Sequence, residues 1–377
     1  MSYSAMPSFG LRRGAVINPD ETAKNIQLLI SSAQKECGRK IKSVFVNIGG
    51  SHLYVMPSDG LISVSRADHV ISQEDIDRVL QATKAVNVPL NEDILDVFAK
   101  EYIIDDQRGI KQPLGLNGIR LEAKVILLCY FQQYFMNLTQ AVLSAKLQID
   151  DIIPSVLAAS KAVLTPQQKE LGVALIDIGS ATSSIAVFEE GDLLHLAVFP
   201  LGSANITNDL AIGLKTEVAI AEDIKIQHGA CIISADGRTK KQPAKKIEVS
   251  DKSYPVDFTK KNLVDIIGPR VSEILDLMHK ELKKIGRQEL LPGGIVLTGG
   301  GAKLPRIKEL VKQQLKLPCQ IGFPKGIAGL DQDPSLATVA GLVLESYDAN
   351  DFRGGFSFGF LKRFFSKFRR AFRVFIP

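Results

Sequence analysis

Three consecutive glycines, Gly299, Gly300 and Gly301, follow a short apolar run at residues 295–298 and precede Lys303. The run is too short for a helix and a helical pattern follows the glycines, so the stretch predicts a strand, a tight turn and a helix. Because glycine has no Cβ, such a turn admits a flat or anionic ligand close to the backbone. A connection packed for structural reasons alone predicts the same pattern, and both interpretations stay open here.

A second turn lies between apolar runs at residues 173–178 and 183–187, with Asp177 just before it. Its small and hydroxyl residues offer amide and OH groups to phosphate oxygens, and the Asp177 carboxylate could hold a hydrated Mg²⁺. The pattern predicts a phosphate-binding hairpin with a water-mediated metal ligand. The residues of this turn are Gly179, Ser180, Ala181 and Thr182.

Between the two turns, Glu222 and Lys225 stand i and i+3 on one face of a predicted helix. Taken alone, this pair is an ordinary surface salt bridge.

The chain has 377 residues, of which 45% are hydrophobic and 23% charged, so it can bury the cores of one large or two medium domains. Its four cysteines and five histidines are widely scattered, which argues against a disulfide framework, a zinc site and a histidine-based nucleophile. We therefore expect a reducing cytosol. The chain shows neither a secretory signal nor an apolar run long enough to cross a bilayer.

The net charge of +5 is concentrated at the C-terminal end. No acid follows Asp351, whereas seven Lys and Arg side chains do, so the rest of the chain carries 5 minus 7, or −2. The positive charge therefore acts at the tail and not over the body.

Residues 360–377 combine an apolar stripe at i+3 and i+4 spacing with cations over much of the remaining surface. This pattern predicts an amphipathic helix that lies on an anionic membrane. An RNA-binding arm and a helix that docks in a partner's groove are the alternatives. The apolar residues are Phe360, Leu361, Phe364, Phe365, Phe368, Phe372 and Phe375, and the cations are Lys362, Arg363, Lys367, Arg369, Arg370 and Arg373.

Together with residues 118–123, 206–211 and 221–225, the two turns resemble the FtsA family of bacterial cell-division proteins, within the superfamily of actin, sugar kinases and heat-shock chaperones. The likeness runs almost from end to end. It implies an α/β, actin-like (ribonuclease H-like) two-lobed fold with an inserted subdomain and a C-terminal amphipathic helix.

The resemblance also implies how the chain is divided. Residues 1–47 and 129–170 would form the first actin-like domain, 48–128 the inserted subdomain, 171–215 the phosphate part of the second domain, 216–289 its small lobe, 290–345 the adenosine motif, 346–359 a flexible linker and 360–377 the membrane-targeting helix.

The implied ligands are ATP and Mg²⁺, held by the two turns and Gly202, with Glu222 and Lys225 at the ribose and base. The implied partners are the C-terminal peptide of the tubulin-like protein FtsZ, further copies of the chain in filaments, other division proteins and the anionic inner membrane, without nucleic acid. The FtsZ peptide would dock on Arg270, Glu273, Lys280 and Lys284. The expected location is peripheral, on the cytoplasmic face of the cell membrane at the division site.

The sequence departs from the family pattern in two places. The first phosphate hairpin, which precedes residue 18 in the family, is absent, and either a start at an internal Met or the loss of half of the clamp explains this. Ser180 and Ala181 replace family glycines, so we expect a reshaped phosphate loop. We accordingly expect an adaptor with weak or no ATPase activity. An actin-superfamily ATPase or kinase and a degenerate, non-hydrolysing membrane scaffold are the alternatives.

Overall fold

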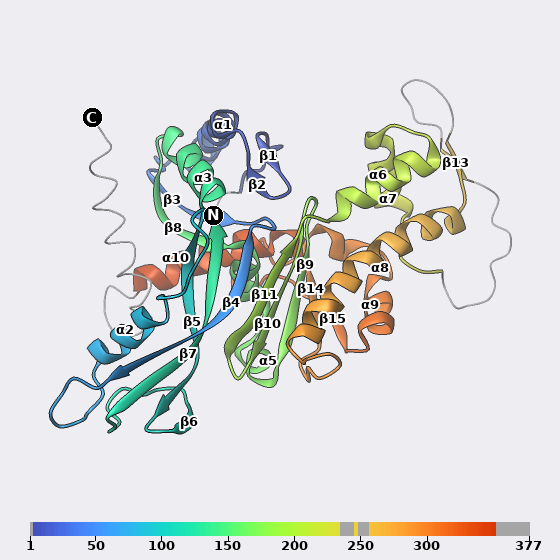
Figure 1. The fold of residues 1–377 in the computed structure, drawn as a ribbon. Helices are drawn as coiled ribbons and strands as arrows, with labels where there is room; N and C mark the ends of the chain where they lie inside the picture. Colours follow the sequence, from blue (N-terminus) through green and yellow to red (C-terminus); the bar gives the residue numbers. More distant parts are fainter. Residues whose placement is uncertain (1–2, 234–244, 248–255, 352–377) are drawn as a thin grey trace.

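The computed structural model describes residues 3–233, 245–247 and 256–351, and Figure 1 shows their arrangement. Two halves of related design are joined by two helices, and a further lobe is inserted into the first half. No helix in these ranges is both long and apolar enough to span a bilayer.

The second half is built on five strands in the order β15-β14-β9-β10-β11. β14 runs parallel to β9 and β15, whereas β10 pairs antiparallel with β9 and β11. Apolar side chains of β9 are buried on both faces of the sheet, as helices on each side require. The strands are β9 (Val173–Ile178), β10 (Ser183–Glu189), β11 (Asp192–Phe199), β14 (Ile295–Thr298) and β15 (Cys319–Ile321).

Helices α8 and α9 pack on one face of this sheet and α4 and α10 on the other, with α5 beside β10. Helices α6 and α7 pack on α8 and form a small lobe with the hairpin β12–β13. The bounds are α4 (Ser155–Val163), α5 (Pro166–Leu171), α6 (Ser203–Leu214), α7 (Val218–His228), β12 (Lys245–Ile247), β13 (Val256–Phe258), α8 (Lys260–Lys284), α9 (Ile307–Leu315) and α10 (Ala337–Asp351).

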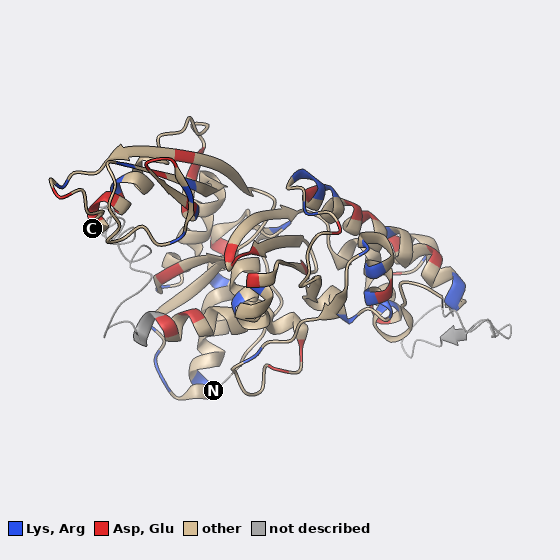
Figure 2. Cartoon of the chain, turned by 90° about the horizontal axis from the view of Figure 1, so that it is seen from below, with Lys and Arg blue, Asp and Glu red and all other residues tan. Residues whose placement is uncertain are grey.

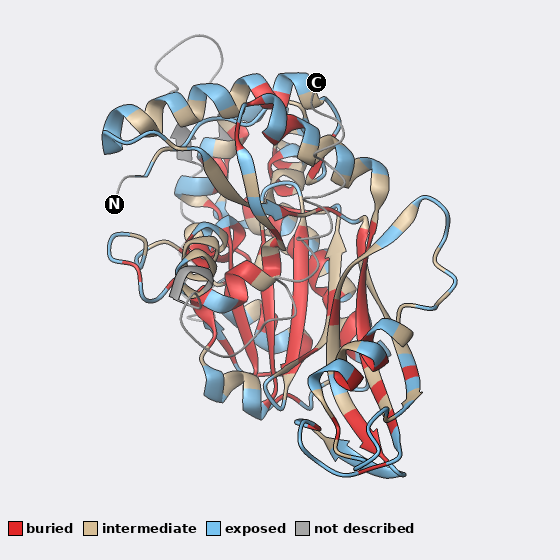
Figure 3. Cartoon of the chain, turned by 90° about the vertical axis from the view of Figure 1, so that its left-hand side faces the viewer, coloured by how far each residue is buried: buried red, intermediate tan, exposed pale blue. Residues whose placement is uncertain are grey.

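In the described residues, the first half has a sheet of only two parallel strands, β3 (Ser43–Ile48) and β8 (Gln148–Pro154). Helices α1 (Pro19–Cys37) and α3 (Gln132–Ser144) pack on each other, α3 contacts β8, and α10 contacts β3. Most β3 side chains are only half-buried, and α1 is largely exposed, as Figure 3 shows. A short hairpin of β1 (Leu11–Arg12) and β2 (Ala15–Val16) precedes α1.

The inserted lobe has four strands in the order β4-β7-β5-β6, covered on one face by α2. A single residue pair, Ala197↔Tyr54, joins β4 to β11, so the two sheets form one nine-stranded ladder. The bounds are β4 (Leu53–Ser63), α2 (Gln73–Ala82), β5 (Glu92–Ile104), β6 (Gln107–Ile110) and β7 (Arg120–Phe131).

The helices α4 and α10 connect the two halves and lie unusually close together. A Cβ added to Gly341 of α10 would overlap the backbone carbonyl of Ala158 in α4. Small residues at Ala158, Ala340 and Gly341 therefore allow this crossing.

Candidate functional site

The hairpin between β9 and β10 is fixed against the start of α6. The amides of Ser203 and Ala204 donate to the carbonyls of Gly179 and Ser180 at 2.8 and 2.9 Å. Gly202 is required by this approach, because a Cβ there would overlap the Ser180 carbonyl. The carbonyls of the hairpin therefore face α6. The backbone amides of Ser180, Ala181 and Thr182 donate no hydrogen bond to any of the described residues.

The backbone of the hairpin can hold residues other than glycine. None of the residues from Gly179 to Thr182 has a positive φ angle. Ser180 and Ala181 therefore occupy the turn without the strain that a left-handed conformation would impose on them.

Different features of the structure explain why each of the three positions after β14 is a glycine. Gly299 has a φ of +83°, and a Cβ there would overlap the Asp177 carboxylate; a Cβ on Gly301 would overlap the Ile178 side chain. Gly300, by contrast, faces space with no atom within 4 Å of an added Cβ. Packing explains Gly299 and Gly301, and only Gly300 is left open to a ligand.

Glu222 and Lys225 belong to a partly buried network, in which Lys225 is buried and Glu222 is not, and do not form an ordinary surface bridge. Lys225 Nζ donates to Glu222 Oε2 at 2.7 Å, to Thr207 Oγ1 at 2.8 Å and to the Ser203 carbonyl at 3.3 Å. Its side chain is 7% exposed, whereas that of Glu222 is 42% exposed. Burial raises the pKa of Glu222, but hydrogen bonds from Lys225 and Thr207 outweigh it and lower that pKa overall. Lys225 thus links α7 to the start of α6 and, through it, to the hairpin.

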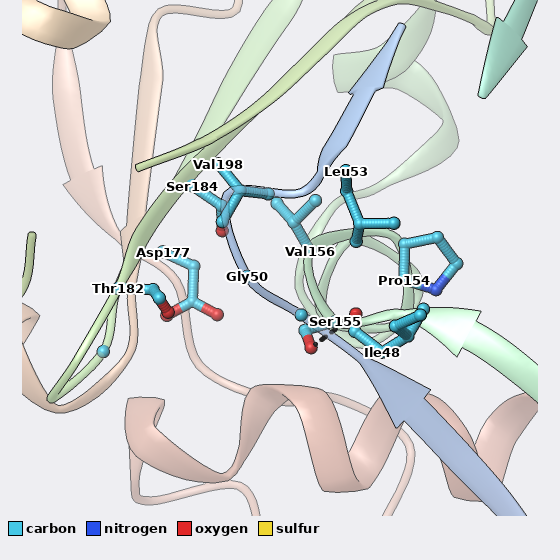
Figure 4. A pocket seen from close by; sticks show the side chains of 12 residues that line it. Ile48, Gly50, Leu53, Pro154, Ser155, Val156, Asp177, Thr182, Ser184 and Val198 are labelled. Atoms are coloured by element: carbon cyan, nitrogen blue, oxygen red, sulfur yellow. Dashed lines mark hydrogen bonds between the residues drawn. The ribbon is translucent and has the colours of Figure 1, made fainter. Parts of the chain in front are cut away.

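A cavity of about 40 Å³ lies where the hairpin meets the first half. Its walls come from the β3–β4 turn, from the start of α4 and from the hairpin, and Figure 4 shows Asp177, Thr182 and Ser155 around it. Asp177 is the single charged residue in this lining. On the scale where roughly 10–15 Å³ of such volume holds one water, the cavity has room for a few waters.

The Asp177 carboxylate has no hydrogen-bond partner among the described residues. Burial raises its pKa to about 6. No group of three or more metal-ligating side chains occurs in the part of the chain that the structure describes. Asp177 could therefore hold a metal only together with water or phosphate oxygens, as the water-mediated assignment requires.

Three expected site residues meet protein partners instead of open space. Lys303 forms an ion pair with Asp333 at 2.5 Å. On α8, Arg270 Nε bonds Asp209 at 2.5 Å, and the same guanidinium contacts Glu273. Positive and negative side chains are interspersed over the helices of this half (Figure 2).

Lys280 and Lys284 lie on the same face of α8 as Arg270 and Glu273 by helical spacing, and Lys284 bonds Glu281 at 2.6 Å. The predicted membrane helix at residues 360–377 and residues 352–359 of the predicted linker fall outside the described residues, whereas residues 346–351 of that linker belong to α10.

Sequence reasoning missed several contributors to the site. Thr207 holds the Glu222–Lys225 pair, Asp333 pairs with Lys303, and Ser155 and Gly50 line the cavity. Thr207 stands in a motif that carries the resemblance, which was a usable signal. Ser155 and Gly50 could not be found because only the three-dimensional fold brings the first half to the hairpin.

The sequence matches two family profiles: "Cell division protein FtsA" over residues 174–341 and "SHS2 domain inserted in FTSA" over residues 50–129. It is 37% identical to the cell division protein FtsA of Pseudomonas aeruginosa, over 90% of this chain and 81% of that protein. Identity to the FtsA proteins of Bacillus subtilis and Escherichia coli is 34% and 33%, over 90% and 91% of this chain and 76% and 83% of those proteins.

Among solved structures, the fold is similar to the PilM-PilN type IV pilus biogenesis complex, with a TM-score of 0.62. Sequence identity is 18%, and the match covers 90% of this chain and 89% of that one, so this likeness concerns the fold alone. It confirms the expected actin-like architecture, and the second profile confirms the inserted subdomain. On sequence identity and coverage, the chain belongs to the FtsA family of cell-division proteins.

Proposed function

We propose that this cell-division protein is an ATP-binding, self-associating adaptor that ties the FtsZ ring to the cytoplasmic membrane and helps to recruit other division proteins. The observation that supports nucleotide binding is the continuous path of hydrogen bonds from the hairpin through the start of α6 to Lys225, together with the open space beside Gly300. These elements offer free amides, a carboxylate and an unobstructed glycine to one ligand.

The residues fit a nucleotide with Mg²⁺. The amides of the hairpin would hold phosphate oxygens, Asp177 would orient hydrated Mg²⁺, and Glu222 and Lys225 would face the ribose and base. Bound Mg²⁺ would neutralise phosphate charge.

The cavity at the hairpin is bounded by residues of both halves, including Gly50 of the β3–β4 turn and Thr182 of the hairpin. A ligand whose phosphates lie there would therefore contact both halves.

The nucleotide proposal is tested by calorimetry with Mg-ATP on the full chain. Gly300→Ala adds a methyl group on the ligand side alone, so we expect affinity to fall about tenfold, which is roughly 1.4 kcal/mol, with an unchanged Tm. Lys225→Ala should weaken binding too, whereas Lys215→Ala, at an exposed C-cap, should not. Equal affinity for the wild type and Gly300→Ala would refute this site.

The membrane proposal rests on the sequence of residues 360–377. Phe368→Glu with Phe372→Glu should release a fluorescent fusion from the membrane and abolish cosedimentation with anionic vesicles. Phe356→Glu, outside the apolar stripe, is the matched control. Unchanged localisation of the double variant would contradict the proposal that residues 360–377 anchor the protein to the membrane.

The partner proposal places the FtsZ C-terminal peptide on the α8 face that carries Arg270, Glu273, Lys280 and Lys284. Lys280→Glu should weaken binding of that peptide about tenfold in an anisotropy titration at low salt. Lys261→Glu makes the same charge change at an exposed position on a different face of α8 and should have little effect. Equal losses in both variants would show a nonspecific charge effect.

A further inference from the structure

A second hollow, of about 490 Å³, lies at the junction of the first half and the inserted lobe. Phe135, Met136, Thr139 and Leu143 of α3 form one wall, and Asp93 and Tyr130 of the inserted lobe form the other. We call this hollow the α3 groove. It shares no lining residue with the cavity at the hairpin, and its volume falls in the range of roughly 300–1,000 Å³ that is typical of ligand sites.

Helix α3 is unusual because none of its 13 residues is charged. Ala141 and Val142 are buried against the body, whereas Met136 and Leu143 on the groove side are 61% and 44% exposed. Surface helices normally carry charged residues on the solvent face. An exposed apolar face beside a hollow of this size marks an interaction surface.

The chain itself supplies a segment that can reach the groove. Helix α10 ends at Asp351, and its last turns are held to α4 by Lys161, which contacts Asp348 at 2.5 Å. α10 packs on β3, and β8, the partner of β3, contacts α3, so the chain leaves the described structure from the unit that carries the groove. Figure 1 shows this end of α10 on the same side of the molecule as β3, β8 and α3. Eight further residues, 352–359, can span roughly 27 Å.

The next segment, residues 360–377, matches the groove in chemistry. Its seven spaced apolar side chains, six of them Phe, suit an uncharged apolar wall. Its six cations suit Asp93 at the groove, whose described lining contains no Lys, Arg or His. A tail with this composition has more to gain from this surface than from the mixed charges of α8.

We propose that residues 360–377 bind the α3 groove of their own chain when no membrane is present, and that anionic lipid competes the segment away. The competition with lipid rests on the proposed membrane function, whereas docking in the groove does not. The groove would thus be covered in the free protein and open on the protein bound to a membrane.

The first test looks for a gain of membrane binding in the full chain. Met136→Glu with Leu143→Glu should release the segment and raise the partition onto phosphatidylglycerol-containing vesicles about tenfold. The Tm of the double variant, measured alongside, must stay close to that of the wild type, since a folding defect also exposes apolar surface. Leu28→Glu on α1, where Leu28 is 60% exposed outside the groove, is the control and should leave partition unchanged. A partition that does not rise in the double variant overturns the proposal.

The second test measures proximity without lipid. In a Cys37→Ser background, which removes the exposed native thiol, Gln140→Cys and Ala371→Cys should form a disulfide within one chain on mild oxidation. Vesicles should prevent that disulfide. No disulfide, or one only between chains, overturns the proposal. If the wild-type protein failed to bind vesicles, the proposed membrane function would be refuted. The cross-link measured without lipid would still test whether residues 360–377 bind the α3 groove.

Discussion

The two halves of the actin-like body bury their strands to different extents. In the second half, five strands lie between two helical layers, and Ala174, Leu175 and Ile176 of β9 are fully buried. In the first half, two parallel strands carry side chains that are mostly half-buried. Parallel strands depend on cover from both faces and both edges, so the first half relies on α4, α10 and the inserted lobe.

This difference separates two roles. Proposed ligand contacts lie on the rigid second half, where glycines are fixed by close packing. The α3 groove lies beside the loosely buried first half, where β3 pairs only with β8 among the described residues. A half that exposes apolar surface is suited to partners, and a half that buries it is suited to hold a ligand in fixed geometry.

The largest effect is expected at the junction of the halves. Gly341→Ala places a methyl group on the Ala158 backbone, which cannot rotate away, so we expect a loss of about 3 kcal/mol in unfolding free energy. In Gly213→Ala, the obstacle is the flexible end of Ile266, and the change should be small. Urea unfolding measures both. Similar losses would show that the close crossing of α4 and α10 is unimportant for stability.

Truncating one valine in each sheet compares how much buried apolar surface stabilises the two halves. Val187 in β10 is fully buried, whereas Val46 in β3 is half-buried. Val187→Ala should cost about 2 kcal/mol and Val46→Ala less than about 1 kcal/mol, because the second removes less buried surface. The comparison of the halves fails if the β3 variant is equally destabilised in urea unfolding.

Within the second half, the buried carboxylate of Asp177 lowers the free energy of unfolding, and we propose that it is present to orient Mg²⁺. Its folded-state pKa of about 6 lies above its ordinary value, so the folded form favours the protonated carboxyl, and stability falls as pH rises from about 4 to 6. Asp177→Asn should be more stable than wild type at pH 7, because it removes the buried charge. We expect a gain of only about 1 kcal/mol, since the Asp177 side chain is partly exposed to the cavity. The gain should shrink at pH 4.5. A destabilised Asp177→Asn at pH 7 would contradict the assignment.

The smallest effect concerns the contact of the inserted lobe with the second half. Lys111 Nζ bonds Asp192 at 2.7 Å and Glu190 at 3.1 Å, and its side chain is 42% exposed. Lys111→Ala should cost less than about 1 kcal/mol because the pair is screened by solvent. Thermal unfolding at low and high salt checks this. A loss above 2 kcal/mol would mean that the lobe is held far more strongly than its exposed contacts suggest.

Much of the fold could be predicted because local signals and the resemblance agree. The apolar run before the three glycines predicted a strand, and the structure has β14 there. Strand patterns around Asp177 predicted β9 and β10. The site was less predictable, since sequence cannot tell which of three glycines faces a ligand or that Lys303 pairs with Asp333. The α3 groove could not be predicted at all, because its walls come from distant segments.

The single backbone pair between Ala197 and Tyr54 offers an experimental opportunity. Each sheet would keep its own ladder if that step broke, and the buried cluster that Leu128 and Leu196 share would be the main barrier to opening. Probes on β4 and β11 would therefore work as a molecular ruler for rotation of the inserted lobe, and could be read by fluorescence transfer in living cells.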